Sequence, residues 1–220
     1  MKFTKADIRR SMLLYAVTDR TWLRQGQTLT QVTEEVLQGG ATFLQIREKE
    51  LDREAFLAEC GELRALAQRY QVPFVVNDDV DLALACDADG IHVGQSDIQG
   101  RDIRALIGPE KILGITANTV ELALAAQRAG ADYIGVGAVF GTTTKKDAKP
   151  LSVPALREIC DAVDIPVVAI GGINKDNLPR LAGSGVDGVA MVSALFAQPD
   201  PKAAAEQLRA LAEEMVKSHG

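Results

Sequence analysis

The chain has 220 residues, of which 47% are hydrophobic and 25% are charged, and its formal net charge at pH 7 is −6. This composition is typical of a soluble globular protein, and the negative charge argues against nucleic acid or an anionic membrane as the partner. No apolar run approaches the ~20 residues that a membrane-spanning helix needs. The first ten residues are mixed and charged, unlike a secretory signal. We expect one catalytic domain over residues 1–220.

The cysteines indicate a reducing compartment. Cys60, Cys86 and Cys160 are far apart in the sequence and lack metal-ligand spacing, and their odd number argues against a disulfide framework. Buried, reduced thiols are the expected state, so we expect a cytoplasmic protein.

Short apolar runs rich in β-branched residues alternate with segments of helical periodicity along the whole chain. The runs predict strands at Leu13–Val17, Thr42–Ile46, Phe74–Val76, Gly90–Val93, Ile112–Ile115, Tyr133–Val136, Val167–Ile170 and Gly188–Val192. The helical segments include Asp52–Tyr70, Thr119–Ala129, Val153–Ala162 and Ala203–Lys217. Strands buried on both faces, with helices between them, form a parallel sheet. Eight such strands in a chain of this length predict an α/β fold, a single (β/α)8 TIM barrel.

A short motif with glycine and aspartate precedes several expected strands. It reads Ala88-Asp89-Gly90, Gly130-Ala131-Asp132 and Gly185-Val186-Asp187-Gly188. Glycine commonly ends a helix, and here the next strand follows at once. The motif therefore marks repeated strand–helix units within one domain.

Active sites of such barrels lie at the carboxyl ends of the strands. The second strand leads there into Gln45, Arg47 and Lys49, which alternation along an extended chain places on one side. Two cations and an amide at a strand end can bind a polyanion. On this stretch alone the alternative has equal weight, namely a salt-bridged loop in which Glu48 and Glu50 are the partners.

The third and fourth strands end in carboxylates, Asp78 and Asp97. One or two carboxylates, completed by water and substrate phosphate, form a usual Mg²⁺ site, so this pair is the expected metal site. Each aspartate taken alone is more often a helix cap. Asp79 or Asp81 fits that role after the third strand, and Asp97 or Asp102 fits it after the fourth.

The last two strands indicate a phosphate site. Gly171 and Gly172 follow the seventh strand, and Ser193 follows the eighth. In these barrels the loops after strands 7 and 8 bind phosphate with a short helix start, and paired glycines let backbone N–H groups approach the anion. Ser193 either caps the turn at 194–197 or donates to the phosphate.

Histidine chemistry is not expected. His92 lies inside an apolar strand, where a packed structural role is expected, and His219 lies in the tail. A histidine-based hydrolase or a zinc enzyme is therefore disfavoured. Two anion sites and a metal, without an evident nucleophile, indicate a transfer reaction in which pyrophosphate leaves.

The ordered set of strand-end residues resembles the thiamine-phosphate synthase (thiamine-phosphate pyrophosphorylase) family. The matching segments are QIREK at 45–49, ND at 77–78, DGIHVGQSD at 89–97, GVG at 135–137, TTTKKD at 142–147 and AIGG at 169–172. The resemblance implies a barrel that joins a hydroxymethylpyrimidine pyrophosphate to a thiazole phosphate with the help of Mg²⁺. A pyrimidine methyl cation forms as pyrophosphate leaves, and the thiazole nitrogen captures it. The implied partners are two phosphorylated small molecules.

The same resemblance implies residue roles, position by position. It assigns the pyrimidine pyrophosphate to Gln45, Arg47, Lys49 and Asn77, with a hydroxyl from Thr116 and a cation from Lys145, and Mg²⁺ to Asp78 and Asp97. It assigns the thiazole phosphate to Thr142, Thr144, Gly172, Val192 and Ser193. Lys49, Thr116 and Lys145 are the implied catalytic residues.

The chain departs from the family pattern at two places. The family commonly has Gly-Val-Ser-(Ala/Cys)-His where residues 114–118 read GITAN, and proline where Gly141 stands. Thr116 keeps the hydroxyl of serine, whereas Asn118 removes the histidine. A related thiazole tautomerase is expected to use that histidine and to lack the full set of aspartates and lysines, so the synthase is favoured. A non-catalytic phosphate-binding barrel, which needs no Mg²⁺ ligands, is a further alternative. A homo-oligomer, formed by pairing of apolar helix faces, is also compatible with the sequence.

Overall fold

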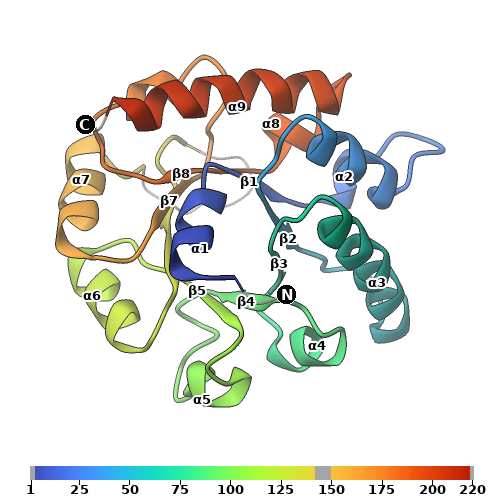
Figure 1. Cartoon of the computed structure of the whole chain (residues 1–220), viewed down its shortest axis with the longest axis horizontal. Helices are drawn as coiled ribbons and strands as arrows, with labels where there is room; N and C mark the ends of the chain where they lie inside the picture. The colour runs from blue at the N-terminus through green and yellow to red at the C-terminus, as the bar shows by residue number, and fades with distance from the viewer. Residues whose placement is uncertain (1–2, 142–149, 219–220) are drawn as a thin grey trace.

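The computed structural model describes residues 3–141 and 150–218. Eight parallel strands pair in sequence order, and the eighth pairs with the first, so that the sheet closes into a barrel with helices outside it (Figure 1). The predicted (β/α)8 barrel is confirmed.

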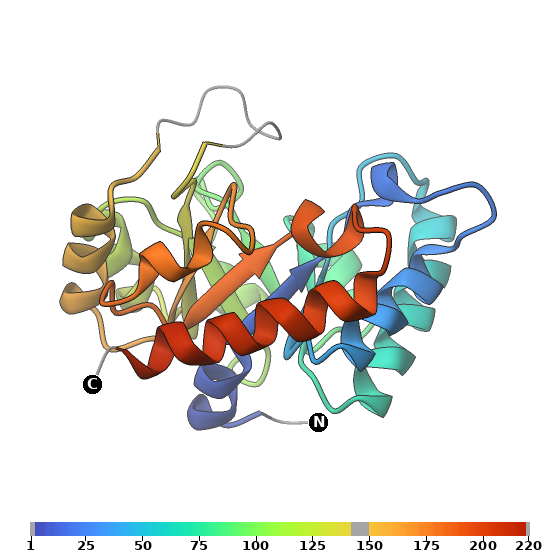
Figure 2. The ribbon, with the colours of Figure 1, turned by 90° about the horizontal axis from the view of Figure 1, so that it is seen from above.

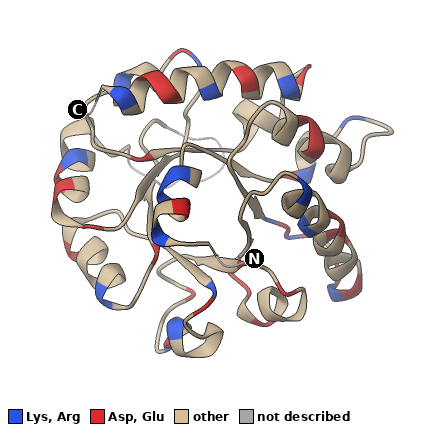
Figure 3. Ribbon diagram, viewed as in Figure 1, with Lys and Arg blue, Asp and Glu red and all other residues tan. Residues whose placement is uncertain are grey.

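The strands lie within one residue of the bounds that the apolar runs predicted. They are β1 Leu14–Val17, β2 Phe43–Ile46, β3 Phe74–Asn77, β4 Gly90–Val93, β5 Ile112–Thr116, β6 Tyr133–Gly137, β7 Val167–Ile170 and β8 Gly188–Met191. None of these strands contains Lys, Arg, Asp or Glu, because both faces of a barrel sheet are covered. Figure 3 shows the charged residues on the outer helices and the connecting loops.

The crossover segments are α2 Leu29–Gln38, α3 Arg53–Arg69, α4 Val80–Ala85, α5 Ile103–Ile107, α6 Val120–Arg128 and α7 Val153–Ala162. The short 3-10 helix η2, Leu178–Leu181, takes the corresponding place after β7, and another, η1 Arg20–Trp22, follows β1. α8 Ser193–Phe196 and α9 Pro201–Lys217 follow β8. The six α-helices of the crossovers and α9 each begin after a Thr, Asp or Ser side chain that accepts a backbone N–H of the first turn.

The N-terminal helix α1, Lys5–Ser11, covers the end of the barrel from which the strands start (Figure 2). Ile8 on this helix and Met12 directly after it are buried in one cluster with Tyr15 and Phe43 from the barrel interior. The polar side chains of the interior that could bind a ligand therefore lie toward the opposite end, where the strands finish.

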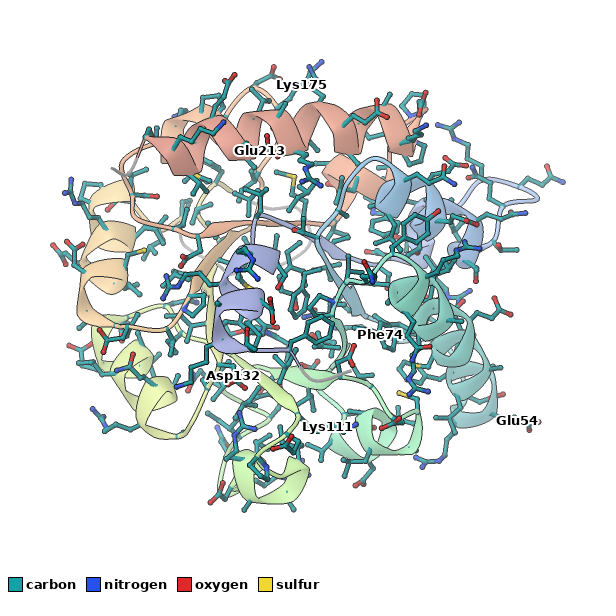
Figure 4. The ribbon with its side chains drawn as sticks, in the orientation of Figure 1. Glu54, Phe74, Lys111, Asp132, Lys175 and Glu213 are labelled. Carbon is teal, nitrogen blue, oxygen red and sulfur yellow. The ribbon has the colours of Figure 1, made fainter. Side chains whose placement is uncertain are left out.

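The aspartates of the repeated motif hold the starts of the strands. Each carboxylate accepts the N–H at or near the start of the preceding strand, which fixes the entry of that strand into the barrel. The pairs are Asp89 with Phe74 at 2.9 Å, Asp132 with Leu113 at 2.9 Å and Asp187 with Val167 at 2.8 Å. Phe74 and Asp132 are labelled in Figure 4, Asp132 just below α1 and Phe74 to the right of it in that view. These carboxylates lie where the strands start, and residues at this end of such a barrel contribute to stability and not to catalysis.

Candidate functional site

The end of β2 carries cations that the neighbouring glutamate does not neutralise. Glu48 is paired with Arg20 and also accepts the backbone N–H groups of Lys49 and Glu50 at 2.7 and 2.8 Å. Burial raises the pKa of Glu48, but its hydrogen bonds with Arg20 and these two N–H groups bring the pKa below the usual value. The alternative in which Glu48 neutralises Arg47 or Lys49 is therefore wrong.

Arg47 and Lys49 line a pocket between the loops after β1 and β2. The pocket has a volume of about 330 Å³ and is lined by Asp19, Arg20, Thr21, Trp22, Arg47, Glu48, Lys49 and Glu50. Asp19 Oδ2 lies 3.9 Å from Arg47 Nη1, a long contact that leaves the guanidinium able to bind another anion. Both cations thus lie at the carboxyl end of the barrel, as predicted.

Asp78 and Asp97 lie together after β3 and β4. Burial, and then the charge and hydrogen bonding of Asp97, raise the pKa of Asp78, whereas Asn77 and Lys49 lower it. Lys49, on the loop after β2, is thus near enough to affect the pKa of Asp78. Asp78 has a φ of 66°, and its backbone N–H donates to the carbonyl oxygen of His92 at 2.8 Å.

Of the aspartates after β3 and β4 that could cap the next helix, Asp79 and Asp102 do so, whereas Asp78 and Asp97 do not. Asp79 caps α4 by accepting the N–H of Leu82 at 2.8 Å, and Asp102 caps α5. Asp97 accepts the N–H of Gly94 at 2.8 Å within its own loop, so the prediction that it caps the next helix is wrong.

The pair fits the ligand preference of Mg²⁺. Asp97 raises the pKa of Asp78 because neighbouring carboxylates repel, and a divalent cation between them would relieve that repulsion. Within residues 3–141 and 150–218, no group of three or more His, Cys, Asp or Glu side chains could hold a metal ion. Asp78 and Asp97 are two carboxylates only, so a cation held by them would need water or substrate phosphate as its other ligands.

Thr116 and Asn118, the residues at β5 that depart from the family pattern, both form hydrogen bonds within the barrel. Thr116 ends the strand, its Oγ1 lies 3.0 Å from His92 Nε2, and its carbonyl oxygen accepts from Gln95 Nε2 at 2.6 Å. Asn118 Oδ1 accepts the N–H of Gly137 at 2.9 Å and so ties the loop after β5 to the end of β6. Asn118 thereby helps to hold the backbone around the site in place.

His92 has the packed position expected of it, with hydroxyl groups as its partners. Its ring is half-buried in the barrel interior, 5.5 Å from the Tyr133 ring between centroids, and both ring nitrogens have hydroxyl partners. Tyr133 in turn contacts Tyr15, which accepts from Gln45 Nε2 at 2.7 Å. Neither tyrosine is among the residues predicted from the sequence; the one signal for them is their position in the interior-facing register of β1 and β6.

The loops after β7 and β8 lie at the same end of the barrel. Gly171 and Gly172 have φ values of 102° and 68°, and a Cβ on Gly172 would lie 2.4 Å from the carbonyl oxygen of Phe140. The glycine pair thus permits the close approach of the loop after β6. Val192 occupies the N-cap position of α8 and Ser193 is the first residue of that helix, so the capping role predicted for Ser193 is wrong.

Three predicted ligands, Thr142, Thr144 and Lys145, lie outside the described residues. The described chain on either side of them is held by backbone hydrogen bonds to the loop after β7 and to the end of β6. The N–H of Phe140 donates to the carbonyl oxygen of Gly171 at 3.0 Å, and that of Leu151 donates to Ala138 at 2.8 Å.

The three cysteines carry free thiols: Cys60 is buried, whereas Cys86 and Cys160 are half-buried. Among the described helices, none has both the length and the apolar character needed to cross a membrane.

Several known proteins are similar to this chain in sequence or fold. The family model for thiamine monophosphate synthase matches residues 14–195. A thiamine-phosphate synthase of Clostridium tetani is 47% identical over 195 residues, 89% of this chain and 93% of that protein. One of Alkaliphilus oremlandii is 48% identical over 197 residues, 90% of this chain and 94% of that protein. The solved structure of a thiamine phosphate pyrophosphorylase from Pyrococcus furiosus is 40% identical with a TM-score of 0.86, over 94% of this chain and 98% of that one.

Proposed function

The chain belongs to the thiamine monophosphate synthase family and is a transferase, and we propose from this premise which reaction it performs. It condenses 4-amino-2-methyl-5-hydroxymethylpyrimidine pyrophosphate with 4-methyl-5-(2-hydroxyethyl)thiazole phosphate, or with the carboxylated form of that thiazole. The products are thiamine phosphate and pyrophosphate. The observation that carries the proposal is that Arg47 and Lys49 follow β2 while Asp78 and Asp97 follow the neighbouring β3 and β4 at the same end of the barrel, because a departing pyrophosphate needs cations and a metal site side by side.

The pyrophosphate binds at the ends of β2, β3 and β5. Arg47 and Lys49 supply positive charge, Asn77 and Gln45 supply amide donors, and Thr116 supplies a hydroxyl. Asp78 and Asp97 hold Mg²⁺, which when bound neutralises charge on the leaving pyrophosphate. The Arg20–Glu48 pair keeps Glu48 away from the anion.

The thiazole phosphate binds across the barrel at the loops after β7 and β8. Gly172, Val192 and Ser193 are the described residues that we assign to it. The proposal adds Thr142 and Thr144 to this phosphate and Lys145 to the pyrophosphate; these three lie outside the described residues.

The reaction proceeds by dissociation. The bond between the pyrimidine methylene carbon and the pyrophosphate oxygen breaks, and its electron pair leaves with pyrophosphate. The lone pair of the thiazole nitrogen then forms the new carbon–nitrogen bond with the pyrimidine methyl cation. Lys49, Thr116 and Lys145 stabilise the negative charge on the departing group, and no general base is required.

The proposal is tested by removing the carboxylate pair. Asp78→Asn combined with Asp97→Asn is expected to abolish Mg²⁺-dependent turnover while calorimetry still detects binding of the thiazole phosphate. Asp79→Asn is the matched control, because asparagine caps a helix about as well as aspartate. Turnover that is equal with and without Mg²⁺, or that survives in the double variant, contradicts the assignment. Conversion of a thiazole phosphate alone, without release of pyrophosphate, would favour the tautomerase alternative.

A further inference from the structure

A continuous chain of hydrogen-bonding side chains crosses the barrel interior from β2 to β5. The contacts are Gln45 Nε2 to Tyr15 Oη at 2.7 Å, Tyr15 Oη to Tyr133 Oη at 2.7 Å, Tyr133 Oη to His92 Nδ1 at 3.0 Å and His92 Nε2 to Thr116 Oγ1 at 3.0 Å. We propose that this chain fixes His92 as the neutral tautomer with its hydrogen on Nε2 and thereby makes Thr116 a hydrogen-bond donor at the carboxyl end of β5.

The direction of the chain is set at Gln45. An amide nitrogen can only donate, so Tyr15 Oη accepts from Gln45 and passes its own hydrogen to Tyr133. Tyr15 is 1% exposed and Tyr133 is fully buried, and burial raises the pKa of both hydroxyls above the usual value, so each keeps its hydrogen. A buried hydroxyl that lacks an acceptor is costly, which favours the arrangement in which each donates to the next group.

The tautomer of His92 follows from this direction. Tyr133 accepts from Tyr15 and donates to His92 Nδ1, and a nitrogen that accepts cannot carry a hydrogen. A neutral imidazole then has its hydrogen on Nε2, which donates to Thr116 Oγ1.

Thr116 Oγ1 consequently accepts a hydrogen bond from His92, and the hydrogen of its own hydroxyl is left to donate to a group that is not one of these five side chains. In the opposite direction, Thr116 would donate to His92 and present only lone pairs, which repel an anion. The assignment of this donor to the pyrophosphate rests on the proposed function. Tyr15, Tyr133 and His92 are then positioning residues that act through Thr116.

Two glycines make room for the rings of this chain. A Cβ on Gly114 would lie 2.3 Å from Tyr133 Oη and 2.6 Å from His92 Nδ1. A Cβ on Gly135 would lie 3.1 Å from His92 Cε1. The contact between Tyr133 and His92 therefore depends on the absence of side chains at neighbouring positions of β5 and β6.

The tautomer is tested by nitrogen-15 NMR on the full chain without substrates. The sequence contains two histidines, so His219→Gln leaves His92 alone in a long-range proton–nitrogen correlation spectrum. We expect an unprotonated Nδ1 and a protonated Nε2. The Nδ1–H tautomer, an average of both tautomers, or an imidazolium at neutral pH overturns the proposal.

The role in catalysis is tested by a double-mutant cycle. Tyr133→Phe is expected to release the tautomer preference and to lower kcat by about tenfold, the effect of one hydrogen bond to a charged group. In a Thr116→Val background the same change should lower kcat no further, because the chain acts through Thr116. Tyr70→Phe is the control, since the Tyr70 hydroxyl donates to Glu34 outside the barrel at 3.2 Å.

An equal fold loss from Tyr133→Phe in both backgrounds indicates a merely structural effect and overturns the positioning role. Failure of the proposed function is distinguishable from this outcome, because an enzyme without synthase turnover still yields the tautomer of His92 in the spectrum.

Discussion

The backbone N–H of Asp78 donates to the carbonyl oxygen of His92 at 2.8 Å, which binds the residue after β3 to the strand that precedes Asp97. Asp78 has a φ of 66° at this point, a conformation that asparagine and aspartate tolerate better than most residues. This hydrogen bond holds the chain after β3 against β4, so the backbone itself brings together the two loops that carry the carboxylates.

This arrangement predicts that Mg²⁺ stabilises the protein through the pair. At about 100 times its Kd, a ligand adds about 2.7 kcal/mol to the free energy of unfolding, which raises the Tm of a domain of this size by roughly 5–10 °C. Differential scanning calorimetry should show this rise in the wild type and in Asp79→Asn, and no rise in Asp78→Asn. Equal rises in all three proteins would place the ion elsewhere.

The carboxylates at the opposite end of the barrel should affect stability alone. Asp132 accepts from the Leu113 N–H and from Arg104, whose guanidinium also donates to the Gly130 carbonyl oxygen. Asp132→Ala leaves the Leu113 N–H without this partner and should lower the free energy of unfolding by about 1–3 kcal/mol. Urea denaturation measures this loss, and kcat should stay unchanged. The control is Asp161→Ala, whose carboxylate is 71% exposed and should change the free energy by less than about 0.5 kcal/mol. A fall in kcat without a loss of stability would refute this division of roles.

Two glycine-to-alanine changes should have opposite signs. Gly114→Ala places a Cβ 2.3 Å from Tyr133 Oη and should cost about 1–3 kcal/mol. Gly61 lies within α3 and has open space where a Cβ would be added, so Gly61→Ala should stabilise the protein by about 0.5–1 kcal/mol. Chemical denaturation of the two variants beside the wild type decides the matter, and the same sign for both would contradict the packing described here.

The thiol of Cys86 should be reactive at neutral pH. Its hydrogen bond with Cys60 lowers the pKa of Cys86 to about 7 and raises that of Cys60, and Cys86 is half-buried whereas Cys60 is buried. Because the thiolate is the nucleophile, the rate of alkylation of Cys86 should rise as the pH increases through about 7. Mass spectrometry of iodoacetamide-treated protein measures this midpoint. Cys60→Ala should move the midpoint upward, and an unmoved midpoint would exclude the hydrogen bond as its cause.

The strands could be predicted from the sequence because uncharged, β-branched runs that are buried on both faces differ sharply from the amphipathic segments between them. The closed barrel followed from their number. Within the site, strand-end placement was enough to put Arg47 and Lys49 on one pocket.

The other features of the site could not be predicted, because they depend on contacts between residues that are far apart in the sequence. A carboxylate before a helix fits a cap or a ligand equally well, and only the hydrogen bonds separate Asp79, the cap, from Asp78. The partner of Glu48 is Arg20, which lies on the loop after another strand. The partners of His92 could not be predicted, because a single strand does not show that tyrosines from β1 and β6 lie in the same interior.

The central claim is that the barrel joins two phosphorylated substrates with loss of pyrophosphate. The most direct measurement is to mix the pyrimidine pyrophosphate and the thiazole phosphate with Mg²⁺ and the purified protein, and to quantify both products over time. Thiamine phosphate and pyrophosphate should accumulate in equal amounts, and no thiamine phosphate should form when either substrate is omitted. Release of pyrophosphate without thiamine phosphate, or no product from both substrates together, would contradict the account.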